Sequence, residues 1–144
     1  SAGYELSIAP EGAARLTLRA NGAETSAAST AKVSDGQWHH LLVEVDRAAA
    51  RITFHVDGVA AGQGAIDTIG KDAALSNPSD FVVGKGLVGA VDFLRVCRST
   101  VAESKTTIAE LYAWQFDGPF RKDFTGRKPG KGRSRDCGAL QRAP

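Results

Sequence analysis

The stretch DGQWHHLLVEVDRAAARITFHVDG, residues 35–58, decides the fold of this chain of 144 residues. Apolar and polar residues alternate with a period of two over 41–46 and again over 52–57, which is typical of β-strands with one buried face. The link at 46–51 turns the chain between these strands, and Asp57-Gly58 is a hairpin signal that sends it back. We expect the large ring of Trp38 to cover the edge of the core. The stretch predicts one wall of a β-sandwich, and nothing in it indicates a reaction centre.

Further strands are predicted on both sides of this wall. Alternating apolar residues at 4–8 and again at 16–18 flank a turn at Pro10-Glu11-Gly12. The small, polar stretch at 24–32 is expected to form an edge strand. After the wall, a short strand is expected within 60–69, and the run Phe81-Val82-Val83 is typical of a buried strand. With a last strand at 91–96, the pattern predicts about seven to nine strands before residue 98.

Several of these segments contain sequence motifs that occur together, in this order, in a known superfamily. The opening Asp-Gly-x-Trp-His and the later Val-Asp-Gly are followed by Val83-Gly84 and then by Gly89-Ala90-Val91-Asp92-Phe93-Leu94-Arg95-Val96. Over residues 3–98 the chain thus resembles the laminin G-like, concanavalin A-like lectin/glucanase superfamily. The resemblance implies an antiparallel jelly roll that binds glycans or proteins, often beside a structural calcium ion. It also implies additional N-terminal strands, which we expect another segment or another chain to supply.

The C-terminal third departs from the strand pattern. Thr107 to Glu110 has the spacing of a capping box, and the apolar residues after it predict one helix over 107–113, which ends before Pro119. We therefore expect a sandwich over 1–98, a helix docking on it within 99–118, and an irregular basic tail over 119–144. The ending Arg135 to Leu140 is similar to the last residues of large secreted bacterial proteins, so we expect this chain to be the C-terminal part of such a protein.

The net charge of +2 hides an uneven distribution. Residues 119–144 hold 8 Lys and Arg against 2 Asp and Glu, which leaves 10 against 14 for residues 1–118. The tail can lie along the acidic body, or it can bind an anionic polymer such as a sulfated or uronate-rich glycan. Nucleic acid is not expected as a partner, because the basic run offers no platform of stacking rings. No apolar run approaches the length of a membrane span.

The chain has two cysteines, Cys97 and Cys137, which follow no metal-ligand spacing and no Cys-x-x-Cys pattern. A disulfide between them would attach the tail to the sandwich, as is reasonable in a secreted protein. The alternative is two unrelated thiols. We expect the bridge, and with it a secreted, periplasmic or cell-envelope location.

The sequence does not predict an enzyme. The glucanase branch of the resembling superfamily has a strand with alternating carboxylates, and here Glu44 and Asp46 share a face without a third acid. The neighbouring residues His39 and His40 face opposite ways on a strand, so they do not readily bind one metal. His55 falls on the outward face of the second strand. We expect all three to be surface or edge histidines.

Asp92 is the candidate metal ligand. If the strand at 91–97 is regular, its carboxylate shares a face with apolar residues and needs hydrogen bonds, a cation or a position at the rim. One interpretation is a rim residue that accepts backbone N–H bonds. The other is a calcium ligand, since Ca²⁺ takes carboxylate and carbonyl oxygens and the resemblance implies an Asp here in that role.

These observations predict an all-β, antiparallel two-sheet jelly-roll sandwich with one short C-terminal helix. The predicted function is a non-catalytic module that binds a polysaccharide or packs on a catalytic partner. The alternative is a purely structural role in stabilising a larger polysaccharide-active enzyme. Because most aromatic residues are expected in the core or beside the helix, we expect any glycan to bind at the loop end near Asp92.

Overall fold

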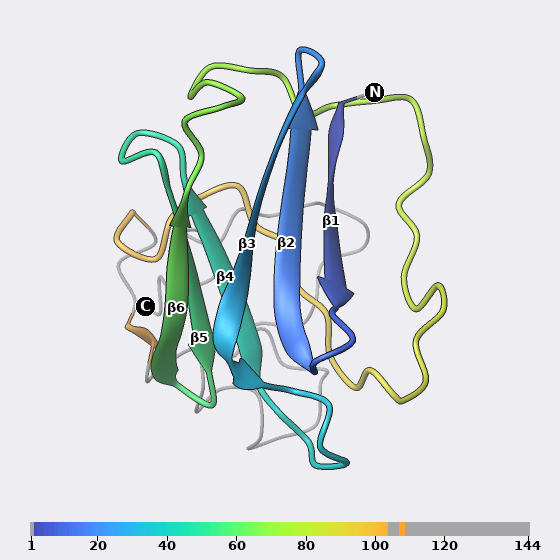
Figure 1. Cartoon of the computed structure of the whole chain (residues 1–144). Helices are drawn as coiled ribbons and strands as arrows, with labels where there is room; N and C mark the ends of the chain where they lie inside the picture. Colours follow the sequence, from blue (N-terminus) through green and yellow to red (C-terminus); the bar gives the residue numbers. More distant parts are fainter. Residues whose placement is uncertain (1, 104–106, 109–144) are drawn as a thin grey trace, which may run out of the picture. The chain divides into compact units, whose positions relative to one another are not determined.

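The structure, a computed structural model, describes residues 2–103 and 107–108 (Figure 1). The chain divides into two compact units, one ending at Asn77 and the other beginning at Pro78. The first unit forms two three-stranded antiparallel sheets, ordered β1-β2-β3 and β4-β5-β6. The strands are β1 Gly3–Ile8, β2 Ala13–Ala20, β3 Ala23–Lys32, β4 Leu41–Asp46, β5 Arg51–Val56 and β6 Val59–Ala65. The all-β prediction with two antiparallel sheets is confirmed.

One apolar core unites the two sheets of this unit. Alternate residues of β2 and β5 point into it, as the period of two predicts for strands with one buried face. Leu18, Ile52, Phe54 and Ile66 are the largest side chains that are fully buried. Burial of one such side chain contributes about 1.5–3 kcal/mol, so this cluster is the main source of stability in the unit.

Two hairpin turns have the backbone that their sequences predict. Asn21 and Gly22 join β2 to β3 with φ of 54° and 77°, and Asp57 and Gly58 join β5 to β6 with φ of 52° and 78°. Two consecutive positive φ values define the type I′ turn, which Asn-Gly and Asp-Gly favour because their twist matches that of the flanking strands. The second of these turns positions a side chain of the candidate site.

The two sheets approach each other most closely along β3 and β6. Thr25 Oγ1 of β3 donates a hydrogen bond to Ala65 O at 3.1 Å. Gly62 and Gly64 of β6 face the β3 backbone and Ala27, respectively, with no space for a Cβ atom. We call this contact of β3 and β6 the β3–β6 seam.

The opposite side of the core is only partly covered. Tyr4, Leu6 and Ile8 of β1 lie opposite buried residues of β2 in the strand register, so they share the core face of that sheet. Yet they are 39–50 % exposed. The core therefore stops at β2, and the edge strand β1 keeps an apolar row that it does not bury.

Two predicted strands of the second unit are wrong. The structure assigns no strand to residues 81–83 or 91–96, so the described residues contain six strands rather than seven to nine. Phe81, Val82 and Val83, predicted to be buried, are 52–64 % exposed, and Phe93 is also exposed. Strand preference depends on packing against cross-strand neighbours, and no strand of the described residues pairs with these segments.

The predicted C-terminal helix can be followed only at its beginning. Ile108 is helical, whereas residues 109–113, like the predicted basic tail at 119–144, lie outside the described residues. Within the part of the chain that the structure describes, no helix is long and apolar enough to cross a membrane.

Candidate functional site

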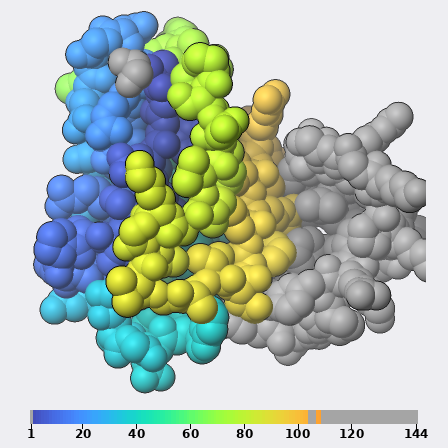
Figure 2. All heavy atoms as spheres, turned by 90° about the vertical axis from the view of Figure 1, so that its right-hand side faces the viewer, coloured from blue at the N-terminus to red at the C-terminus, as the bar shows by residue number. Residues whose placement is uncertain are grey.

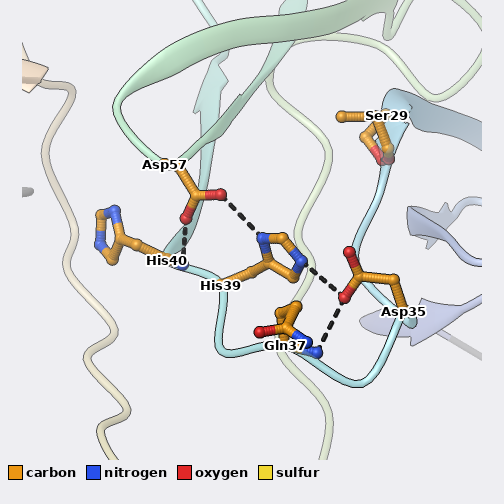
Figure 3. A network of polar contacts seen from close by, with 7 residues as sticks. Ser29, Asp35, Gln37, His39, His40 and Asp57 are labelled. Carbon is orange, nitrogen blue, oxygen red and sulfur yellow. Dashed lines mark hydrogen bonds and ion pairs between the residues drawn. The ribbon is translucent and has the colours of Figure 1, made fainter.

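The side chain of Asp57 links the turn between β5 and β6 to the loop that precedes β4. Asp and Asn tolerate positive φ better than most residues, which suits Asp57 to this turn. One carboxylate oxygen, Oδ1, accepts a hydrogen bond from the backbone N–H of His40 at 2.8 Å. The other, Oδ2, lies 2.7 Å from Nδ1 of His39 (Figure 3). The turn and the loop are thereby fixed to each other.

A second carboxylate, that of Asp35, holds the other side of the same ring. Its Oδ1 accepts a hydrogen bond from the backbone N–H of Gln37 at 2.9 Å, which closes a local turn of the loop. The same oxygen lies 2.9 Å from Nε2 of His39 (Figure 3). His39 thus has a carboxylate on each ring nitrogen, and we call Asp35, His39 and Asp57 the His39 clasp.

This arrangement favours the charged imidazolium of His39. The hydrogen bond to Asp57 and then that to Asp35 raise the pKa of His39 above its usual 6.5, with burial opposing them. Burial raises the pKa of Asp57, but the hydrogen bonds from His39 and from the His40 N–H outweigh it and leave that pKa below 3.8. The pKa of Asp35 is lowered first by the Gln37 N–H and then by His39. The clasp is a charged network at mildly acidic pH.

The histidines do not match the prediction of three surface or edge residues. His40 is buried, and its side chain is desolvated enough to lower its pKa below 6.5. The side chain of His39 is only 17 % exposed. The prediction was wrong for His40, and His39 is half-buried, because the loop folds back on the turn, which brings residues 18 positions apart together. His55 is half-buried on β5.

The clasp is not arranged for nucleophilic catalysis. Ser29 lies in the same view (Figure 3), but its hydroxyl accepts the Ala14 N–H and donates to Ala31 O at 2.6 Å. Both nitrogens of His39 already contact carboxylates, so neither is available to take a proton from a hydroxyl. Asp46, one of the two acids considered above, accepts the Ala49 N–H at 2.9 Å and so caps its own turn.

The outer face of the β4-β5-β6 sheet carries a row of hydrogen-bonding side chains. Glu44 of β4, Thr53 of β5 and Gln63 of β6 are cross-strand neighbours in the register. Cross-strand neighbours on one face lie about 5 Å apart, so these groups form a continuous polar surface. Carboxylate, hydroxyl and amide groups together offer both donors and acceptors.

A shallow hollow of about 360 Å³ lies at one end of this face. Its lining consists mostly of small residues together with two longer polar ones: Ala49, Ala50, Arg51, Gln63, Gly64 and Ala65. Gln63 therefore belongs both to the row and to the hollow, and Arg51 provides the guanidinium of the hollow.

The position of Trp38 before β4 predicted that its ring would cover the edge of the core. This prediction is wrong. The Trp38 side chain is 66 % exposed, on the loop between β3 and β4. Figure 2 shows this loop, coloured cyan, at the surface of the molecule. The buried residue of this segment is His40 instead, so the loop turns its histidines inward and its indole outward.

Asp92 lies in an irregular and exposed part of the second unit, not on a strand. Among the residues that the structure describes, no three His, Cys, Asp or Glu side chains come together as a metal site. A calcium ion at Asp92 would therefore take its other ligands from elsewhere, and the assignment stays a prediction. The cysteine bridge also stays a prediction, because Cys137 lies outside the described residues.

Sequence reasoning found the residues of the clasp but not their association. The Asp-Gly pair at 35–36 and the Asp-Gly pair at 57–58 both appeared as turn or opening signals. An Asp two positions before a backbone N–H commonly closes an Asx turn, and that signal was available at Asp35. The contact between His39 and Asp57 depends on the hairpin register, which only the folded unit shows.

Comparison with known proteins identifies a family for most of the chain. The family model described as the concanavalin A-like lectin/glucanases superfamily matches residues 1–105. Neither the comparison with curated proteins nor that with solved structures gave a match.

Proposed function

This chain belongs to the concanavalin A-like lectin/glucanase superfamily, and from that premise we propose that it is a non-catalytic module that binds carbohydrate. The observation that supports the proposal is the polar outer face of the β4-β5-β6 sheet. Thr53 and Gln63 are cross-strand neighbours there, and the exposed Gln63 can exchange hydrogen bonds with sugar hydroxyls. The shallow, open hollow beside Gln63 adds Arg51 as a further hydrogen-bonding side chain at the end of this row.

A glycan array probed with the complete chain tests this proposal. We expect binding to at least one oligosaccharide, and Gln63→Ala should weaken it about five- to tenfold, because one hydrogen bond contributes about 1 kcal/mol. Ser26→Ala is the matched control, since Ser26 is exposed on β3 of the other sheet. Absence of binding to every neutral and anionic glycan would contradict the proposal.

A structural role is the second candidate, and the half-exposed apolar row on β1 favours it. Tyr4, Leu6 and Ile8 expose an apolar surface beside the core, and the strand that carries them is at the edge of its sheet. An edge strand with such a row is suited to pairing with a further strand. Under this alternative, another segment or chain supplies those strands, and the module packs on a larger polysaccharide-active enzyme.

Three further parts of the proposal come from the sequence and the family. We propose secretion to the periplasm, the cell envelope or the medium by a bacterium, a bridge between Cys97 and Cys137, and a structural calcium ion at Asp92. Mass spectrometry of the non-reduced chain checks the bridge, and two free thiols would exclude it. A melting temperature that is the same with calcium and with a chelator would exclude the metal. Signal-dependent export of the parent protein checks the location.

A further inference from the structure

Trp38 is an exposed aromatic residue on a loop whose other side chains are polar or turned inward. Its indole is 66 % exposed, whereas its neighbour His40 is buried and His39 is only 17 % exposed. A single exposed apolar side chain is common on protein surfaces, so exposure alone does not mark a binding site. What distinguishes Trp38 is the fixed backbone on both sides of it.

The backbone is fixed on both sides of Trp38. Before it, the Gln37 N–H donates to Asp35 Oδ1 at 2.9 Å. After it, the His40 N–H donates to Asp57 Oδ1 at 2.8 Å, and the ring of His39 contacts both carboxylates (Figure 3). Only the indole itself remains to be ordered when a ligand binds. A rigid aromatic group presented in this way loses little conformational entropy on binding.

We propose that Trp38 is a sugar-stacking residue, whose indole takes the apolar C–H face of a pyranose ring. A pyranose has an apolar face and a polar rim, and Trp38 offers an apolar ring with an N–H donor beside the exposed Gln37. A protein partner would require a contiguous apolar patch, often several hundred Å². The residues at 34–37, which precede the indole, are all polar or glycine and are exposed. This inference rests on the proposed carbohydrate binding and adds its aromatic residue.

Calorimetric titration of the complete chain with cellohexaose, laminarihexaose and xylohexaose tests the inference. We expect Trp38→Ala to lower the affinity for the best of these sugars at least tenfold, and Trp38→Phe to lower it only about threefold, because a smaller ring still stacks. Val59→Ala is the matched control, since Val59 is 68 % exposed and apolar but lies outside this loop. Unchanged circular dichroism and melting temperature of Trp38→Ala would show that the fold is intact.

Fluorescence gives an independent readout. The chain has two tryptophans, so in Trp114→Phe all tryptophan emission comes from Trp38, and we expect it to shift on addition of the sugar. Binding by the wild type that is equally strong in Trp38→Ala would overturn this inference and leave carbohydrate binding standing. Absence of binding by the wild type to all three sugars and to the glycan array would overturn both.

Discussion

Gly62→Ala should lower the free energy of unfolding by about 2–4 kcal/mol, because alanine at this position is unfavourable both for the backbone conformation and for the space around its Cβ atom. Gly62 has a φ of 118°, which side chains rarely adopt. A Cβ atom would also lie 2.9 Å from Ala28 O and 3.2 Å from Thr30 N, both backbone atoms of β3. Backbone cannot rotate out of the way as a side chain can, so the β3–β6 seam itself would have to open.

Urea denaturation checks this prediction, and two neighbouring glycines make it specific. Gly22→Ala measures the cost of a positive φ alone, because Gly22 has a φ of 77° with no atom near its Cβ position. At Gly64 the obstacle is the Cβ of Ala27, so Gly64→Ala should be destabilising and Ala27→Gly should rescue it. The prediction is wrong if Gly62→Ala costs no more than Gly22→Ala.

His39→Gln should remove a stabilising contribution that depends on pH. Hydrogen bonds to charged groups contribute about 1.5–3 kcal/mol, and solvent screening at the partly exposed Asp57 reduces the expected loss to about 1–2 kcal/mol. Since the folded-state pKa of His39 is raised, its contribution is complete below the unfolded value of about 6.5 and is lost as pH rises through the folded value.

Asp35 and Asp57 set the lower limit of the pH range in which the His39 clasp stabilises the fold. The pKa values of Asp35 and Asp57 are lowered, so their contribution is present above about 3.8 and is lost as pH falls through the folded values. The clasp should therefore stabilise most between about pH 4 and 6.5. His40 acts in the opposite direction, since its lowered pKa makes the folded state more stable above pH 6.5.

The difference between wild type and His39→Gln isolates the clasp from His40, which both proteins share. Unfolding free energies from urea titrations at pH 5.5 and pH 9 provide the measurement. Asp57→Asn is the companion variant, because Asn retains the turn and one acceptor oxygen but not the charge. A difference between wild type and His39→Gln that is equal at the two pH values would contradict an ionic clasp.

The sequence predicted the parts of the fold that depend on local pattern. Alternation marked β1, β2, β4 and β5, and the Asp57-Gly58 signal marked the hairpin that joins β5 to β6. The segments at 81–83 and 91–96 have equally apolar sequences but form no strand. A strand also needs a neighbouring strand in register, which the apolar pattern of one segment does not reveal.

The candidate site was harder to predict than the strands because it depends on where loops fold. Trp38 was expected against the core, since a large apolar ring next to a strand is commonly buried. The structure instead buries His40, whose backbone N–H is held by Asp57, and this leaves the indole outside. The expectation that any glycan binds at the loop end near Asp92 rested on Trp38 being buried. The exposed indole favours a site that includes Trp38 instead.

The order of the strands has a consequence for how this unit reaches its native state. Among the described residues, each sheet pairs strands that follow one another along the chain, so both sheets can grow from hairpins that close within microseconds. The β3–β6 seam joins residues about 40 positions apart, as in the bond from Thr25 to Ala65. Such distant contacts close late, so association of two preformed sheets should be the slow kinetic step. Because the turns are already formed when the sheets associate, a substitution in either turn should slow folding, whereas an equally destabilising substitution in the seam should act more on the unfolding rate.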